Sequence, residues 1–148
     1  MQYSFDNGAR IPVVVVHCLD WRFVRATWEF VVKELGIPFF TPYSFPAGPR
    51  VLLDEMTRSV FLRALDDVSI GHHKIRQIIL IAHRDCKAYG GTERFESREA
   101  ERAVHERDLR LARGMLRRKY PEVDVELFYM EIVSMTGSEG KIEAQRVD

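Results

Sequence analysis

The sequence predicts an α/β fold: one single-domain parallel β-sheet, spanning residues 1–148, with crossover helices on both faces. Short apolar runs rich in β-branched residues alternate with amphipathic stretches along the whole chain. The runs are continuously apolar, which is typical of strands covered on both faces of a parallel sheet. A chain of 148 residues suits one domain. Alternating strands and helices therefore predict parallel strands joined by right-handed crossovers.

The first half of the chain contains two predicted strands and the helix between them. The run IPVVVVHCLD, residues 11–20, is the first strand, and residues 22–35 form an amphipathic helix that Gly36 ends. The proline-punctuated run IPFFTPYSF, residues 37–45, is the second strand. Its aromatic residues are expected in the core or at a subunit contact. The helix is expected to place Phe23, Thr27, Phe30, Val31 and Leu35 inward, and the aromatic residues of the second strand are Phe39, Phe40, Tyr43 and Phe45.

The second half repeats the alternation. A helix is predicted over residues 51–68, a buried strand over 75–83, a charged helix over roughly 93–120 and a fourth strand over 123–133. The chain is then expected to turn at residues 137–140. The inward sides are expected to hold Leu52, Met56, Val60 and Leu65 in the first of these helices, and Val104, Leu111 and Met115 in the second.

Composition excludes several classes of function. Lys plus Arg equals Asp plus Glu at 22 each, so no net field attracts the chain to nucleic acid or to a membrane surface. The apolar run from Ile11 to Val16 is too short for a signal core or a spanning helix. We therefore expect a cytoplasmic protein. Its two cysteines, Cys18 and Cys86, then fit metal ligands, catalytic groups or core residues better than a disulfide, which stays open as an alternative.

Two predicted strands end in groups that bind metals. The first ends at Cys18, and the third ends at His83 with Cys86 three residues later. Ligands of open parallel sheets bind beyond the carboxyl ends of the strands, so neighbouring strands would bring these three residues together. A Cys2His set suits Zn²⁺, and three protein ligands leave the fourth position open, as in catalytic zinc sites.

Asp20 and Arg22 follow Cys18 at alternate positions. An extended chain would point all three side chains to one face. Arg22 would keep Asp20 ionised. The carboxylate would then accept a hydrogen bond from a water on the metal, or itself become the fourth ligand. The helix expected after Cys86 would favour the thiolate form of that residue.

The pattern C-x-D-x-R followed by H-x-x-C resembles the β-class carbonic anhydrases. It stands here as Cys18-Leu19-Asp20-Trp21-Arg22 and His83-Arg84-Asp85-Cys86. The segments FPAGPRVLLDEMTRSV and FYMEIVSMTGSEGKI are similar to that family's Ala-Gly loop with its helix and to its last core strand. The resemblance covers about residues 13–142, and the two metal motifs together make it specific.

The resemblance implies Cys18, His83 and Cys86 as ligands of Zn²⁺, and Asp20 and Arg22 as the catalytic pair beside them. It implies reversible hydration of CO2 to bicarbonate by zinc-bound hydroxide, in a homodimer or a larger homo-oligomer. Hydrolysis of COS or CS2, known for some relatives, stays open as an alternative substrate.

Three departures from the family pattern stand out. Lys87 replaces the usual Gly after the second Cys, where a cation would crowd the pocket or favour an anion. Pro49 follows Gly48 in the Ala-Gly loop and removes a backbone donor. Only about a dozen residues precede the first strand, so we expect no helical arm that wraps a partner.

Two rival functions are compatible with a fold of this class. The first is a thiol phosphatase or reductase, also with a cysteine at a strand end. Such a phosphatase needs a C-x5-R loop, but the sixth residues after Cys18 and Cys86 are Val24 and Thr92, which argues against it. A non-enzymatic zinc-binding or anion-binding module on the same fold remains an alternative.

The remaining histidines and the charged helix have simpler interpretations. His17, His72, His73 and His105 are expected at the surface or in packing, with a proton-shuttle role for one of them as the alternative. Acidic and basic residues alternate along the charged helix, which indicates a solvated face and no nucleic-acid patch.

Overall fold

The computed structural model describes residues 1–2 and 13–148, and its centre is a five-stranded sheet in the order β2-β1-β3-β4-β5. Strands β1 to β4 are parallel, and β5 is antiparallel to β4. The predicted α/β fold is confirmed. Ile11 and Pro12 of the expected first strand, and any amino-terminal arm within residues 3–12, lie outside the described residues. The strands are β1 (Val13–Cys18), β2 (Thr41–Phe45), β3 (Gln77–His83), β4 (Asp124–Thr136) and β5 (Glu139–Val147).

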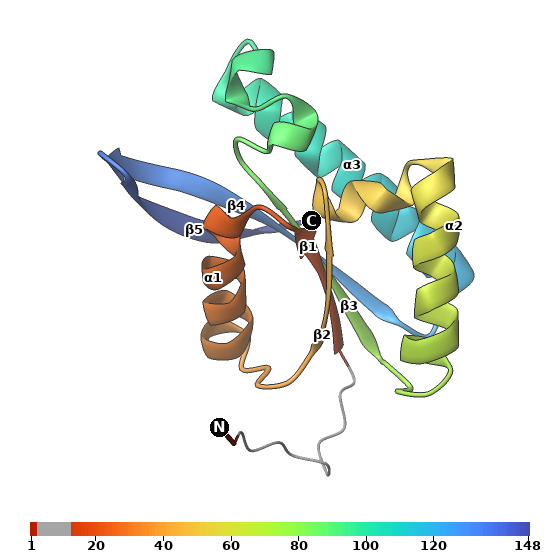
Figure 1. Cartoon of the computed structure of the whole chain (residues 1–148). Coiled ribbons are helices and arrows are strands. Elements are labelled where there is room, and N and C mark those ends of the chain that lie inside the picture. The colour runs from red at the N-terminus through yellow and green to blue at the C-terminus, as the bar shows by residue number, and fades with distance from the viewer. Residues whose placement is uncertain (3–12) are drawn as a thin grey trace.

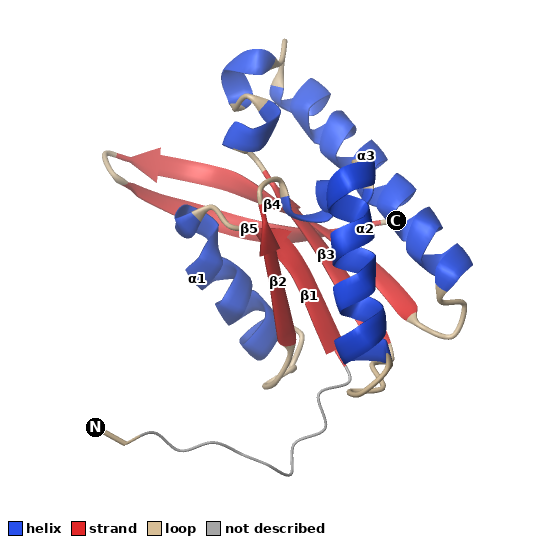
Figure 2. Ribbon diagram, turned by 45° about the vertical axis from the view of Figure 1, so that its right-hand side comes forward, coloured by secondary structure: helices blue, strands red, loops and turns tan. Residues whose placement is uncertain are grey.

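Helices cover both faces of the sheet, as predicted (Figures 1 and 2). One face packs against α1 (Trp21–Glu29) and the other against α2 (Glu55–Ala64) and α3 (Arg98–Lys119). Successive valines of β1 alternate between these two apolar layers, which explains why the run is apolar throughout. Within the described ranges, no helix is long and apolar enough to cross a membrane.

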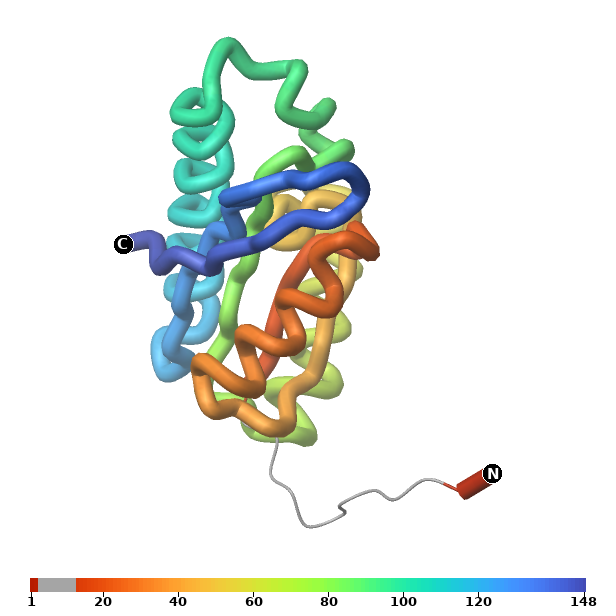
Figure 3. The backbone as a smooth tube through the Cα atoms, turned by 90° about the vertical axis from the view of Figure 1, so that its left-hand side faces the viewer, coloured from red at the N-terminus to blue at the C-terminus, as the bar shows by residue number. Residues whose placement is uncertain are grey.

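The fifth strand was not predicted. The sequence of β5, EGKIEAQRV, contains few apolar residues because this strand lies at the edge of the sheet. β4 is longer than its parallel partner: Asp124 to Met130 pair with β3, whereas Glu131 to Thr136 pair only with β5. The end of this β4–β5 ribbon therefore extends beyond the rest of the sheet, near the start of α1 (Figures 1 and 3).

The predicted inward faces of the second and third helices were correct only in part. Leu52 and Leu65 are fully buried as predicted, but Met56 is 82% exposed and Val60 67% exposed, whereas Phe61 of the same helix is fully buried. In α3, Leu111 is 54% exposed, and the helix begins after the capping Ser97, later than expected. Part of the buried side of α3 is polar, so the positions of the apolar residues alone do not predict which side of the helix faces the sheet. The buried residues of α3 are Glu101, His105, Asp108, Leu109, Ala112 and Leu116.

A left-handed turn before α2 lies close to the end of β1. Ala47 and Gly48 have positive φ values of 59° and 51°. A Cβ atom on Gly48 would lie 2.8 Å from the backbone nitrogen of Cys18 and 2.8 Å from the carbonyl carbon of His17. Only glycine adopts this conformation without strain and permits this close approach of two backbones.

We predict that Gly48→Ala lowers the free energy of unfolding by at least about 2 kcal/mol, because the cost of a left-handed alanine adds to the cost of the clash between its Cβ and the backbone. Gly114→Ala is the matched control, since a Cβ there meets no atom within 4 Å and the site is inside α3. It should raise the same free energy by about 0.5–1 kcal/mol. Urea unfolding measures both, and equal stabilities for the two variants would contradict this account of the turn.

Candidate metal centre

The parallel pairing of β1 with β3 brings the three predicted metal ligands together. Cys18 is the last residue of β1 and His83 the last residue of β3, and these strands are neighbours in the sheet. Cys86 lies one turn beyond His83. The ligand atoms of all three residues lie within 4.8 Å of one another, and all three residues are buried. The predicted convergence at this edge of the sheet is confirmed.

The imidazole of His83 is oriented for a ligand on its Nε2 atom. Its Nδ1 lies 2.7 Å from the backbone oxygen of Arg84, so Nδ1–H donates to that carbonyl and Nε2 holds the lone pair. Nε2 is buried and has no hydrogen-bond partner among the described residues. The ring also packs against Phe23 in a tilted arrangement, with centroids 4.0 Å apart. A buried lone pair held in this way fits a metal ion.

The two thiols have the spacing of a shared metal ion. Their sulfurs are 3.9 Å apart. Two sulfurs bound to one tetrahedral zinc, each at about 2.3 Å, would lie about 3.8 Å apart. A hydrogen bond from the Cys86 thiol lowers the pKa of Cys18, and the same bond together with burial raises the pKa of Cys86. The free pair therefore retains one proton, which a dication would displace. The donor set fits Zn²⁺.

Asp20 and Arg22 form an ion pair at the start of α1. Asp20 caps the helix, since its Oδ1 accepts from the backbone N–H of Arg22 at 3.1 Å. The guanidinium donates to the same carboxylate, with Nη2 2.6 Å from Oδ2. These hydrogen bonds hold the pKa of Asp20 below its usual value. The predicted ionised pair is confirmed in geometry.

The reason given for the alignment of Asp20 and Arg22 was wrong. The chain is not extended as far as Arg22, because α1 begins at Trp21, so strand parity does not orient Arg22. The expected helix after Cys86 also differs. Cys86 precedes two short 3₁₀ turns, Lys87–Tyr89 and Thr92–Arg94, and α3 begins only at Arg98. In the part of the chain that the structure describes, no carboxylate joins the three ligands within 4.8 Å.

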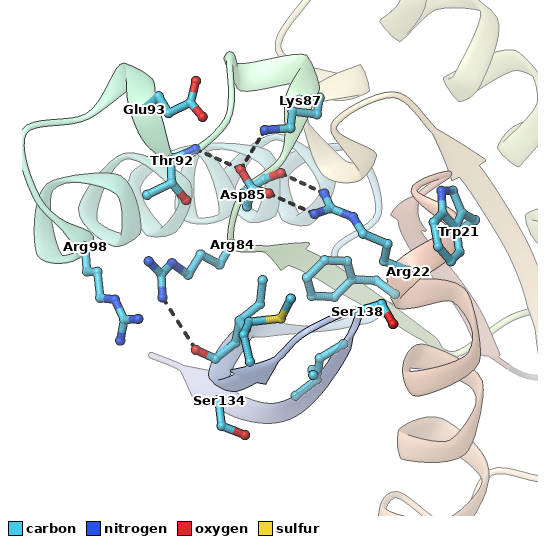
Figure 4. A pocket seen from close by; sticks show the side chains of 15 residues that line it. Trp21, Arg22, Arg84, Asp85, Lys87, Thr92, Glu93, Arg98, Ser134 and Ser138 are labelled. Atoms are coloured by element: carbon cyan, nitrogen blue, oxygen red, sulfur yellow. Dashed lines mark hydrogen bonds and ion pairs between the residues drawn. The ribbon is translucent and has the colours of Figure 1, made fainter.

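Asp85 is a functional candidate that the sequence analysis did not identify. Its Oδ2 accepts from Nη1 of Arg22 at 2.8 Å, and its Oδ1 accepts from Nζ of Lys87 at 3.0 Å. Burial opposes its ionisation, but the hydrogen bonds from Arg22, Thr92 and Lys87 outweigh burial and lower its pKa. Lys87 thus pairs with Asp85 (Figure 4). An acidic residue within the H-x-x-C motif was the available signal.

A cleft of about 790 Å³ borders this ion-pair network (Figure 4). Arg22, Asp85 and Lys87 line it on one side, and the β4–β5 ribbon lines it on the other with Ile132 and Ile142. Cys18, His83 and Cys86 are not among its lining residues. Arg22 and Asp85 therefore connect the candidate metal centre with the walls of the cleft.

The other histidines divide into two groups. His72 and His73 are exposed, as expected. His17 is buried and hydrogen-bonded through Nε2 to the hydroxyl of Ser44 at 2.8 Å. His105 is buried in α3, and neither ring nitrogen has a hydrogen-bond partner within the described residues. Burial lowers the pKa of His105 to about 4, so this residue is neutral at pH 7 and serves in packing.

Comparison with known proteins gives the family. A family model described as "Putative carbonic anhydrase" matches residues 9–138. The chain belongs to this family. The fold agrees, because the parallel sheet with one antiparallel edge strand and helices on both faces is also found in solved β-carbonic anhydrases.

Two relatives from Rickettsia share moderate sequence identity with the chain. An uncharacterized protein of Rickettsia conorii is 29% identical over 123 residues, which are 79% of this chain and 66% of the relative. An uncharacterized protein of Rickettsia bellii is 30% identical over 136 residues, 88% of this chain and 79% of the relative. The chain therefore spans about two thirds to four fifths of these relatives.

Solved structures of three β-carbonic anhydrases are similar in fold. A tetrameric enzyme from Sordaria macrospora has a TM-score of 0.54 at 13% identity, covering 84% of this chain and 77% of its own. CafD from Aspergillus fumigatus has a TM-score of 0.55 at 12% identity, and the match covers 82% of this chain and 84% of CafD. Isoform I from Trichomonas vaginalis has a TM-score of 0.53 at 11% identity, and the match covers 97% of this chain and 87% of that enzyme. At these identities the likeness shows the fold alone.

We predict about one zinc ion per chain, lost on Cys18→Ser, His83→Ala or Cys86→Ser. Zinc should also leave as pH falls, because protons compete with the metal for both thiolates and for the imidazole. Elemental analysis of dialysed protein measures the content, and His72→Gln is the control because His72 is exposed. Full zinc content in the Cys86→Ser protein would remove Cys86 from the site.

Proposed function

We propose that the protein is a zinc-dependent carbonic anhydrase that catalyses the reversible hydration of CO2 to bicarbonate and a proton. The observation that carries the proposal is the convergence of Cys18, His83 and Cys86 beside an ionised Asp20–Arg22 pair. Three buried ligands of this kind match catalytic zinc sites, in which a fourth position is left for water. Membership of the carbonic anhydrase family supports the same reaction.

The residues divide the chemistry between them. Zinc, when bound, is a Lewis acid that lowers the pKa of water from ~15.7 to ~7. Cys18, His83 and Cys86 would hold the ion. While it is ionised, Asp20 accepts hydrogen bonds and donates none. It therefore orients the attacking water with a lone pair toward the carbon of CO2. Arg22 keeps Asp20 ionised and in place.

We predict that Asp20→Asn keeps zinc and loses roughly 10²–10⁴-fold in CO2 hydration, because an amide is a weaker acceptor and also presents N–H donors. Asparagine caps helices as well as aspartate does, so the fold should persist. Asp54→Asn is a matched control, since Asp54 caps α2 in the same way. Stopped-flow assays with a pH indicator measure the rates.

Three outcomes of this assay would change the proposal. Near-normal turnover of the Asp20→Asn protein between about pH 6 and 9 would assign Asp20 a structural role. A wild-type protein that binds zinc and leaves CO2 unchanged but releases sulfide from COS or CS2 would have another substrate. A zinc-loaded protein inactive on all three would be a binding module.

The proposal includes a homo-oligomer with α1 at the subunit contact. Trp21 is 82% exposed and Trp28 45% exposed, and with Leu19 and Val24 they line a shallow groove on α1. An exposed patch that includes two tryptophans is typical of an interface. The groove begins one residue after the proposed ligand Cys18, and the Sordaria enzyme is described as tetrameric. We therefore assign the groove to a second copy of the chain.

We expect a dimer or larger assembly of the wild type at micromolar concentration. Trp21→Ser should raise the dissociation constant at least roughly 10-fold, since buried tryptophans contribute strongly at interfaces. Met56→Ser is the control, because Met56 is equally exposed on α2. Sedimentation velocity measures the masses. A wild-type monomer, or an unchanged Trp21→Ser assembly, would contradict this assignment.

A further inference from the structure

Arg22 is held by two carboxylates. On one side its Nη2 and Nε donate to Asp20, at 2.6 Å and 3.0 Å. On the other side its Nη1 donates to Oδ2 of Asp85 at 2.8 Å, and its Nη2 also donates to the backbone oxygen of Asp85 at 3.0 Å. The guanidinium therefore bridges the segment after β1 and the segment after β3 (Figure 4).

Asp85 is itself fixed in place. Its backbone is left-handed, with φ 53°, and its N–H donates to Oε1 of Glu101 at 2.6 Å. Its Oδ1 accepts from the backbone N–H of Thr92 at 3.0 Å. Glu101 is fully buried in α3 and accepts a second bond from the hydroxyl of Thr92 at 2.9 Å. A continuous set of hydrogen bonds thus joins α3 to Arg22 through Asp85.

We propose that Asp85 is a positioning residue that anchors Arg22 and thereby keeps Asp20 from becoming a fourth ligand of the metal; this rests on the proposed function. Asp20 lies two residues after Cys18, so it is held away from the metal only by its bonds to Arg22 and its helix cap. Arg22 anchored by Asp20 alone would follow that carboxylate. The second anchor opposes this movement, because a displacement of Asp20 then breaks its own ion pair with Arg22 or, if Arg22 follows, the ion pair of Arg22 with Asp85.

The test compares Asp85→Asn with the wild type in Co²⁺-loaded protein. Asparagine tolerates a left-handed backbone and keeps one acceptor oxygen, so the fold should persist while the charge is lost. Asp85→Gly is the second variant, because glycine adopts this φ without strain. Glu29→Gln is the control, as Glu29 pairs with Arg25 on the same helix.

Two readouts do not depend on turnover. The first is the side-chain NMR signal of Arg22 Nε–H, measured in metal-free and in Zn²⁺-loaded protein, which should broaden or shift in both Asp85 variants and persist in Glu29→Gln. The second is binding of azide to Co²⁺, seen in the visible spectrum, which reports an exchangeable ligand position. Azide affinity should fall at least about tenfold in the Asp85 variants if Asp20 takes that position, at unchanged cobalt content.

The double variant Asp20→Asn/Asp85→Asn separates positioning from general loss of structure. Azide affinity should return to within about threefold of that of Asp20→Asn alone, because the competing carboxylate is gone. Unchanged azide binding and an unchanged Arg22 signal in the single variants would overturn the proposal, as would a double variant that does not recover. Failure of the wild type to hydrate CO2 would affect the proposed function alone.

Discussion

The candidate site depends on the parallel pairing of β1 with β3. This pairing ends both strands at the same edge of the sheet, so Cys18 and His83 meet although 64 residues separate them in the sequence. Cys86 then needs only one turn to reach them. The close approach of Gly48 to Cys18 adds the Ala-Gly loop to the same edge. A change in the register of these two strands would move Cys18 away from the other two ligands.

Charged residues around the ligands form a second layer that the apolar core does not supply. Asp20, Arg22 and Asp85 connect the starts of α1 and of the loop after β3, and Glu101 extends the network into α3. Full burial of the Glu101 carboxylate is costly unless every oxygen has a partner. It accepts hydrogen bonds from the backbone N–H of Asp85 and from the hydroxyl of Thr92. These bonds offset the cost of burial and stabilise the loop that carries Cys86.

The sequence predicted the elements and ligands that have strong local signals. Apolar runs located four strands, and the motifs around Cys18 and Cys86 located the candidate metal centre. The burial of polar residues has no such signal in the sequence. Glu101 lies on the inward side of α3 because it binds a loop that is distant in the sequence. The weakly apolar β5 is defined by its pairing with β4, which no local pattern predicts. The role of Asp85 depends on the position of Arg22 between two carboxylates, which only the folded structure shows.

X-ray absorption spectroscopy at the zinc edge tests the central claim most directly, that two neighbouring strands and one turn supply a Cys2His centre with an exchangeable fourth ligand. The account predicts two sulfur scatterers at about 2.3 Å and two nitrogen or oxygen scatterers at about 2.0–2.1 Å, with the same count in Asp20→Asn. A shell with one sulfur or with four protein ligands, or zinc bound outside Cys18, His83 and Cys86, would contradict it.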